Sequence, residues 1–399
     1  MREVSRARAA GGTRDRRPDN WWTGETRWRG KPVSRFDLDT GVVLGRQFML
    51  ASQRRRGNFV YEYDWRSRLY TDEDNQVRQA GATWGLALLH RAHPGAQTRA
   101  ALLRALDFWR AGERVDEQGR RWPLYPGDGV ARLGTLALIA LAHIELLRTD
   151  DGDADARADW LGTVHGCIAQ ILRLRDANGR IPDIFDAHTG EGIGEPSPYS
   201  EGEALLALCK AARHAGCDDL WSAIDALAEA GYDANVRVAR AEDADSDTTK
   251  GFYQWASMSW HEIIGAGRDR AGLWSGRLLE LAVWMIDTHR VLERRRNTAY
   301  AFEGLVCAFD VARRNDDPRR DKLDRVIRMG LRNLSRWQVG HHLANTFVAD
   351  APADDPHALG GVQNSRRNAA LRIDVAQHQT HALLLALDMW VGHTATRPG

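Results

Sequence analysis

The chain has 399 residues, of which 43% are hydrophobic, and 55 basic side chains stand against 54 acidic ones. This length supports a large core, built either as one ring-shaped domain or as two or three ordinary domains. The net charge of +1 gives no general reason to expect a nucleic acid or an anionic membrane as partner.

The N-terminal residues are rich in arginine and contain no apolar run of signal-peptide length. They predict a flexible basic extension over residues 1–34, followed by a single domain over residues 35–399. No later segment is long enough and free enough of charge to cross a bilayer. We therefore expect a cytoplasmic location and no membrane span.

Twelve helical patterns follow this extension, and no convincing alternation of apolar and polar residues supports a core built from strands. The sequence therefore predicts an all-α fold. The expected helices lie near 35–54, 78–92, 97–111, 131–148, 155–175, 200–215, 218–240, 252–266, 271–294, 299–315, 320–339 and 373–391.

The patterns alternate between two kinds. Even-numbered members, such as residues 133–142, consist largely of small and aliphatic residues, whereas odd-numbered members, such as 321–332, carry a charged face. Small residues let helices pack closely, and charged faces belong in solvent. The alternation predicts an inner ring of six helices surrounded by an outer ring of six.

The inner pattern that begins at Pro198 shows a polar start followed by an apolar body. Ser200 and Glu203 have the Ser-x-x-Glu spacing of a capping box, which predicts that the helix begins at Ser200 and that Glu203 is part of its cap. Residues 204–209 then leave no polar face, so we expect this helix to be buried on most sides.

A glycine-containing turn recurs between the helices. Gly57, Gly119 and Gly179 each follow an odd-numbered pattern and precede an even-numbered one, at spacings of 62 and 60 residues. A turn glycine followed by an aromatic or aliphatic residue favours one hairpin unit that is repeated. The later half of the chain shows this period poorly.

In helix count, alternation and glycine loops, residues 35–391 resemble the (α/α)6 toroids of the six-hairpin glycosidase-like superfamily. The resemblance implies a barrel of six helical hairpins and an activity such as that of glycoside hydrolases, polysaccharide lyases or sugar 2-epimerases. Related toroids cyclise terpenes or modify peptides. No catalytic signature carries the resemblance, so function has to be argued from the site.

In such a ring, the loops that enter the inner helices gather at one mouth. These loops combine aromatic rings with carboxylates, amides and arginines, a mixture that suits sugars because sugars present apolar ring faces and many hydroxyls. The aromatic candidates for substrate binding are Tyr63, Trp65, Tyr125, Tyr199 and Trp255.

Two carboxylates precede the first two inner helices. Asp74 and Arg78 either form a salt bridge at the helix start or act on substrate, with Arg78 binding a carboxylate or sugar hydroxyls. Asp128 is either a turn former or an acid or base that works with a second carboxylate.

The later inner helices supply further candidates. Glu201 lies in a first helical turn, either as a partner of the helix dipole or as that second carboxylate. Glu303 has apolar neighbours, so it is either an ion-pair member or a functional acid. Asp374 and His378 either tie the last inner helix to the first or provide a carboxylate-oriented histidine for proton transfer.

No other motif asks for a metal or a cofactor, and we expect neither. There is no HExxH spacing and no nucleotide-binding glycine loop. The stretch 243–247 lacks the glycine and the terminal glutamate of a calcium loop and predicts an exposed acidic loop. The cysteines form no CxxC pair and no zinc-finger spacing, which predicts buried free thiols at Cys167, Cys209, Cys217 and Cys307.

The leading hypothesis is a glycoside hydrolase that acts on an oligo- or polysaccharide through Asp128 and Glu201, with Asp74 and Asp374 as further acid or base candidates. An inverting pair of carboxyl groups would lie about 6.5–9.5 Å apart. Trp65, Tyr125 and Trp255 would stack sugar rings, while Arg78 and His378 would bind hydroxyls or a uronate.

Three alternatives remain open at this point. A sugar epimerase or lyase would use His378 or a tyrosine as base, and histidines would dominate its cavity floor. A non-enzymatic ligand-binding scaffold would have every mouth carboxylate neutralised by arginine. A terpenoid cyclase would need a dry aromatic cavity, and the polarity of the loops counts against it.

Overall fold

The computed structural model describes residues 33–149, 152–352 and 354–391. The predicted basic extension lies outside these residues except for its last two positions. Within the described part, six helices form a closed inner ring in which each contacts two neighbours. They are α2 (Gln76–Ala92), α4 (Leu133–Leu147), α6 (Pro198–His214), α9 (Asp247–Gly265), α11 (Ala299–Arg314) and α14 (Ile373–Ala386).

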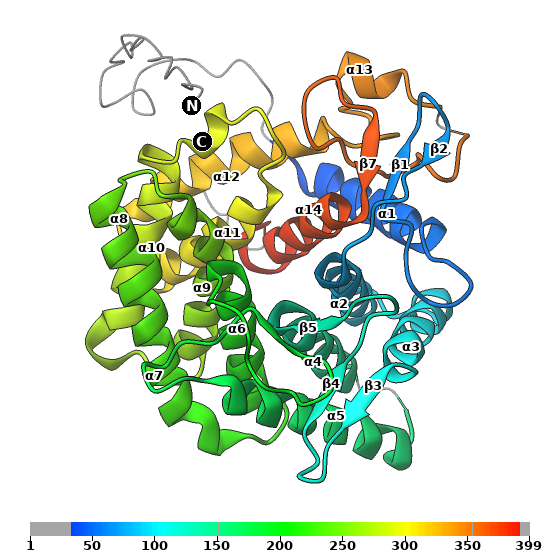
Figure 1. Ribbon diagram of the computed structural model, residues 1–399. Coiled ribbons are helices and arrows are strands. Elements are labelled where there is room, and N and C mark those ends of the chain that lie inside the picture. The colour runs from blue at the N-terminus through cyan, green and yellow to red at the C-terminus, as the bar shows by residue number, and fades with distance from the viewer. Residues whose placement is uncertain (1–32, 150–151, 353, 392–399) are drawn as a thin grey trace, which may run out of the picture. The chain divides into compact units, whose positions relative to one another are not determined.

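The ring closes because α14, the last inner helix, packs against α2, the first (Figure 1). An outer helix precedes each inner one along the chain, and each packs against at least one inner helix. The outer helices are α1 (Arg35–Ala51), α3 (Ala96–Arg110), α5 (Ala154–Leu174), α7 (Trp221–Tyr232), α10 (Leu273–Asp287) and α12 (Arg319–Ser335). The all-α fold and the (α/α)6 arrangement predicted from the alternation are confirmed.

The inner helices are the hydrophobic core of the ring. Residues 133–146 of α4 are all buried, as their small and aliphatic composition predicts. In α12, by contrast, burial is confined to one stripe that includes Leu323, Ile327 and Leu331, and its arginines lie on the other faces. The two kinds of pattern therefore occupy the two rings for the expected physical reason.

Two of the expected helices are interrupted. The pattern 271–294 ends at Asp287, because Arg290 takes a left-handed φ of 55° and no α-helix continues through such a residue. The pattern 218–240 combines α7 with short 3-10, π and α segments. The additional short elements are η1 (Asp218–Leu220), η2 (Asp233–Val238), α8 (Ala239–Glu242), η3 (Arg270–Gly272), η4 (Val291–Glu293), α13 (Thr346–Ala349) and η5 (Leu387–Val391).

The strands of the described residues are two or three residues long and lie in the loops, which is why no alternating pattern marks them in the sequence. All pairings are antiparallel: β1 (Glu62–Asp64) with β2 (Leu69–Tyr70) and with β7 (Ala370–Arg372), β3 (Glu113–Val115) with β4 (Arg121–Pro123), and β5 (Val130–Arg132) with β6 (Ile184–Asp186). The pairs β1–β7 and β5–β6 tie together loops that enter neighbouring inner helices.

The repeated glycine turn is confirmed in the first three hairpins. Gly57, Gly119 and Gly179 have φ values of 108°, 77° and 77°. Each donates its amide N–H to the carbonyl three residues earlier, in turns of the same hydrogen-bonding pattern. Glycine is favoured there because it adopts positive φ without a steric cost.

Two further sequence predictions concern single features. All four cysteines are buried and none forms a disulfide, as predicted. Among the helices of the described residues, none combines the length and the apolar character that crossing a bilayer requires.

Candidate functional site

A cavity of about 750 Å³ lies at the N-terminal ends of the inner helices. Side chains from these helices and from the loops that enter them line it, as the toroid arrangement predicts. The lining residues that matter below are Arg78, Arg132, Asp183, Tyr199, Glu203, Asp247, Lys250, Trp255, Asp374, Gln377 and His378.

A histidine held by a buried carboxylate lies at this cavity. Glu303 of α11 is fully buried, and its Oε1 accepts hydrogen bonds from Nδ1 of His378 at 3.1 Å and from Nδ1 of His381 at 3.0 Å. Donation from Nδ1 puts the lone pair of a neutral His378 on Nε2. Burial alone would lower the pKa of His378, but the charge and hydrogen bond of Glu303 outweigh burial and raise it.

An arginine lies beside this histidine in the cavity wall. Arg78 of α2 forms an ion pair with Asp374 of α14, and Arg372 Nη2 approaches the same carboxylate at 2.7 Å. Asp374 therefore ties the last inner helix to the first, as one of the two interpretations of this residue predicts. The guanidinium of Arg78 also lies 5.7 Å from the centroid of the Tyr61 ring, so its position is fixed from two sides.

The salt bridge between Asp74 and Arg78, one of the two interpretations of this pair, is not formed. Asp74 instead accepts a hydrogen bond from the Tyr125 hydroxyl and one from Gln79 Nε2 at 2.7 Å. Asn75, and not Asp74, caps α2 by accepting from the backbone N–H of Arg78. Asp74 is exposed and does not line the cavity.

Glu203 lines the cavity, although the sequence interpretation assigned it to a helix cap. That capping box is wrong, because α6 begins at Pro198 with Ser197 as N-cap and without a side-chain cap bond. Glu203 lies one turn inside the helix and is 5% exposed. A Cβ on Gly134 of α4 would collide with its carboxyl group, so the glycine makes room for it.

The surroundings of the Glu203 carboxyl group favour its protonated form. Burial, and then the negative charge of Asp183, raise its pKa well above the usual range. The sequence held one signal for this role: no lysine or arginine lies three or four residues before or after Glu203, so no helical ion pair is available to it.

Two other cavity carboxylates are paired with cations. Asp183 lies 3.3 Å from Arg132 Nη1, and the exposed Asp247 lies 3.7 Å from Lys250 Nζ. Each of these carboxylates therefore has a cation within 4 Å, in contrast to Glu203. The cavity thus holds one buried carboxyl group whose pKa is raised and two carboxylates that are paired with cations.

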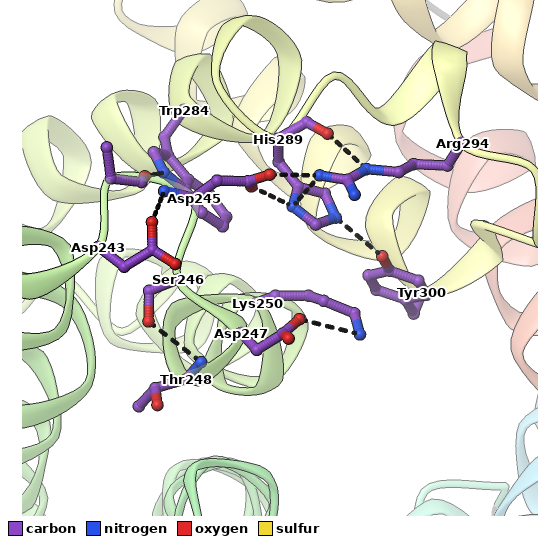
Figure 2. Close-up of polar contacts among 11 residues, drawn as sticks. Asp243, Asp245, Ser246, Asp247, Thr248, Lys250, Trp284, His289, Arg294 and Tyr300 are labelled. Carbon is purple, nitrogen blue, oxygen red and sulfur yellow. Dashed lines mark hydrogen bonds and ion pairs between the residues drawn. The ribbon is translucent and has the colours of Figure 1, made fainter. Parts of the chain in front are cut away.

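The acidic loop 243–247 borders this cavity (Figure 2). Asp243 and Asp247 are exposed as predicted, but Asp245 is not simply solvated. Its two oxygens lie 2.7 Å from His289 Nδ1 and 2.7 Å from Arg294 Nη2. The Tyr300 hydroxyl lies 3.4 Å from His289 Nε2, which extends the network towards α11.

Aromatic rings complete the cavity. Trp255 of α9 is 3% exposed and lines the cavity with its ring 6.2 Å from that of His378. Tyr199 is 49% exposed at the rim. These two are the aromatic candidates from the sequence that the structure brings to the cavity.

The predicted catalytic pair is not brought together at the cavity. Asp128 is exposed and accepts a hydrogen bond from Gln76 Nε2 at 2.6 Å. Glu201 forms a two-pronged ion pair with Arg180, at 2.6 and 2.7 Å, and accepts from Asn235 Nδ2 at 3.0 Å. Glu201 and Glu203 both lie within α6, where successive residues point about 100° apart, so Glu201 takes a different direction from Glu203 and does not line the cavity.

Three of the aromatic residues that were candidates for substrate binding also lie away from the cavity. Tyr63 donates its hydroxyl to Asp355 at 2.7 Å, and the Trp65 ring packs 5.6 Å from that of Phe347. Tyr125 packs 5.5 Å from the ring of Trp109. All three are buried in the loops and walls around the cavity, where their apolar area contributes to packing.

The part of the chain that the structure describes holds no group of three or more His, Cys, Asp or Glu side chains placed to bind a metal ion.

No family model and no curated protein matches this chain, but solved structures share its fold. A sugar epimerase from a ruminal bacterium has a TM-score of 0.65 at 11% identity, over 90% of this chain and 99% of its own. A cellobiose 2-epimerase from Spirochaeta thermophila has a TM-score of 0.61 at 17% identity, over 89% of this chain and 96% of its own. An α-1,6-mannanase of Salegentibacter has a TM-score of 0.60 at 8% identity, over 90% of this chain and 100% of its own. These similarities show that the chain has the fold of the six-hairpin glycosidase-like toroids.

Proposed function

We propose that this chain is a carbohydrate-converting enzyme, in which His378 transfers a proton at a carbon next to the carbonyl group of a sugar. The products are isomers or epimers of the substrate. The observation that carries the proposal is the imidazole of His378, which lines the cavity while its Nδ1 is held by the buried Glu303. The similar structures described as sugar and cellobiose epimerases support the same chemistry.

The proposed step begins with the C–H bond next to the carbonyl. Nε2 of neutral His378 takes this proton, and the electron pair moves towards the carbonyl oxygen to give an enediol or enediolate. Arg78 stabilises the developing negative charge, and neutral Glu203 donates a proton to an oxygen. Return of the proton from His378 to the neighbouring carbon gives the isomer, while the hydroxyl on the first carbon gives its proton back to Glu203 and becomes the new carbonyl. Return to the opposite face of the same carbon, after the enediol has rotated to present that face to His378, gives the epimer, while the enol O–H returns its proton to Glu203.

The other hypotheses fit the cavity less well. The carboxylates chosen for hydrolysis, Asp128 and Glu201, do not line it. A scaffold in which arginine neutralises every mouth carboxylate is disfavoured, because no arginine among the described residues pairs with Glu203. A sugar-derived substrate and a cytoplasmic location remain parts of the proposal.

One observation favours glycoside hydrolysis as the second candidate. Glu203 has a raised pKa, as suits an acid that protonates a leaving oxygen, and Asp183 is a second carboxyl group in the same cavity. In this alternative Glu203 acts as general acid and Asp183 activates water.

The two candidates are separated by incubating the protein with free aldoses and with disaccharides in D2O and recording NMR spectra. Isomerisation or epimerisation introduces deuterium at the carbon next to the carbonyl, whereas hydrolysis releases a new reducing end without such exchange. We expect exchange in the wild type and a loss of about 10²–10⁴-fold in His378→Asn. The exposed His188→Asn is the matched control and keeps the wild-type rate. Exchange that survives in His378→Asn, or a new reducing end alone, contradicts the proposal.

A further inference from the structure

A second cavity of about 540 Å³ adjoins the central one. The two share residues 294–298, which lead from η4 into α11. The second cavity also reaches the C-terminal end of α12, the start of α13 and the loop that precedes β7. It lies outside the group of residues to which the proposed proton transfer is assigned.

Arginine dominates this second cavity, which we name the arginine pocket. Its lining includes one carboxylate, Glu293, against six arginines: Arg294, Arg295, Arg296, Arg336, Arg366 and Arg367. The whole chain has a net charge of only +1, so the positive charge of the pocket is a local feature and does not reflect a basic protein overall.

The positive charge of this pocket is largely uncompensated within the described residues. Arg294 is neutralised by Asp245 at 2.7 Å (Figure 2), and Glu293 lies 3.9 Å from Arg290. The guanidinium groups of the other five arginines make no ion pair with any carboxylate of the described chain. By contrast, Arg78, Arg132 and Lys250, which line only the central cavity, all have carboxylate partners.

Five like charges around one concave surface repel one another, and a bound anion relieves this repulsion. Guanidinium groups bind carboxylate, sulfate or phosphate oxygens through two parallel N–H bonds. Arg367 takes a φ of 59°, a left-handed conformation that is uncommon outside glycine, at the rim of this pocket. Trp337 also lines the pocket and offers an apolar face to a sugar ring.

We propose that the arginine pocket binds the oxyanion groups of an acidic oligosaccharide, while the adjoining sugar unit occupies the central cavity. Arg295 and Arg296 line both cavities, so a ligand of two or more linked units contacts them as it passes from one to the other. This inference rests on the proposed function for the sugar nature of the ligand, and it adds the substrate class: a chain with uronate or sulfate groups.

Binding, measured by isothermal titration calorimetry, tests the inference without relying on turnover. The ligands are a glucuronate-containing tetrasaccharide, its carboxyl-reduced neutral counterpart and a sulfated tetrasaccharide. All are titrated into the His378→Asn protein, in which the proposed chemistry is blocked. A failure of the proton-transfer hypothesis in the D2O experiment then leaves this binding result interpretable.

The pocket variant combines Arg295→Gln, Arg336→Gln and Arg366→Gln. Its matched control combines Arg55→Gln, Arg114→Gln and Arg175→Gln, three exposed arginines that line neither cavity. We expect the acidic tetrasaccharides to bind at least about tenfold more tightly than the neutral one, which corresponds to about 1.4 kcal/mol. The pocket variant loses this preference, and the control keeps it within about twofold.

Several results overturn the inference. Equal binding of the neutral and acidic tetrasaccharides would mean that the pocket is no anion site. If the control variant loses the preference for acidic tetrasaccharides as far as the pocket variant does, the preference comes from the net charge of the protein and not from the pocket. Inorganic sulfate or phosphate bound as tightly as the tetrasaccharides, or an RNA oligonucleotide bound with the same dependence on the three arginines, contradicts a saccharide ligand. A preference for the uronate over the sulfated chain, or the reverse, identifies which oxyanion the pocket takes.

Discussion

The two ends of the inner helices use buried carboxylates in opposite ways. At the C-terminal end of α4, Glu145 is fully buried but is held by Lys210 Nζ at 2.5 Å, Arg91 Nε at 2.7 Å and Arg148 Nη1 at 2.9 Å. Burial opposes ionisation, yet these three cations outweigh it and lower the pKa of Glu145 to about 2. At the N-terminal end of α6, burial and the charge of Asp183 raise the pKa of Glu203, which has no such cation.

The same contrast extends to neighbouring helices. Glu262 of α9 contacts Lys210 and Arg213, and Asp310 of α11 contacts Arg313 and Arg314. Burial opposes ionisation of both, but the cations lower the pKa of Glu262 to about 2, and the hydrogen bond with His261, followed by the arginines, lowers that of Asp310 to about 2. We refer to Glu145, Lys210, Glu262 and Asp310 with their arginines as the ionic belt. Fully paired carboxylates serve packing, whereas one that lacks a cation remains able to give up a proton.

Removal of Lys210 tests the structural half of this comparison. Lys210→Met leaves the buried charge of Glu145 without its closest partner, so we expect the free energy of unfolding to fall by about 3–5 kcal/mol. Urea unfolding followed by circular dichroism measures the change. Adding Glu145→Gln to the variant recovers part of the loss, because the uncompensated buried charge is removed. A loss below about 1 kcal/mol would show that the belt is not held by its charges.

Glu203→Gln tests the other side of the comparison, namely the proposed role of the unpaired carboxyl group in catalysis. Glutamine has nearly the same shape and is always neutral, so it preserves the packing of the protonated glutamate but has no acidic proton to give. We expect turnover to fall by at least about 100-fold. Deuterium exchange at the substrate carbon measures the effect, and unchanged turnover would remove Glu203 from the mechanism.

The same variant makes a prediction about stability and pH. The raised pKa of Glu203 means that the folded chain holds a proton which the unfolded chain has released above its ordinary pKa of 4.5. The unfolded state then binds fewer protons, so this group reduces stability as pH rises above 4.5, until the folded carboxyl ionises. We expect Glu203→Gln to gain stability relative to the wild type between pH 5 and pH 8. Thermal unfolding at several pH values measures it, and a constant difference across this range contradicts a protonated Glu203.

Glu303→Gln examines the histidine that depends on a buried carboxylate. A base must be neutral to take a proton, so wild-type kcat/KM rises with pH through the raised pKa of His378. Without the charge of Glu303, burial dominates and lowers that pKa. The acid limb of the pH profile therefore moves to lower pH, while kcat falls because the imidazole is less firmly held. An unshifted acid limb would mean that Glu303 supports only the packing of α11 against α14.

The comparison also explains what could be predicted from sequence. The two rings follow from local composition, because small residues and charged faces repeat within each helix and mark its surroundings. The site depends on contacts that are remote in sequence. Arg78 finds its carboxylate 296 positions away, and Glu203 owes its raised pKa to burial and to Asp183 across the cavity.

A small error in one helix start had a large consequence for the site. Placing the start of α6 at Ser200 made Glu203 a cap and left Glu201 as the catalytic candidate, whereas the helix begins at Pro198. Successive residues of a helix point about 100° apart, so neighbouring carboxylates face different surroundings. Glu303 stood out in the sequence as a carboxylate among apolar neighbours. The i, i+4 spacing, however, predicted Asp374 as the partner of His378, whereas Glu303 holds this imidazole and Asp374 pairs with Arg78.

The smallest predicted effect concerns Tyr63, a sequence candidate that lies away from the cavity. Its hydroxyl donates to Asp355 at 2.7 Å, and burial, followed by this hydrogen bond, raises its pKa to about 12. Tyr63→Phe removes one hydrogen bond, so we expect the free energy of unfolding to fall by about 1 kcal/mol. We expect kcat and KM to stay unchanged, because the ring keeps its packing. A rise in KM without a loss of stability would instead place the loop around β1 in contact with substrate, and the functional end of the inner helices would extend beyond the cavity walls.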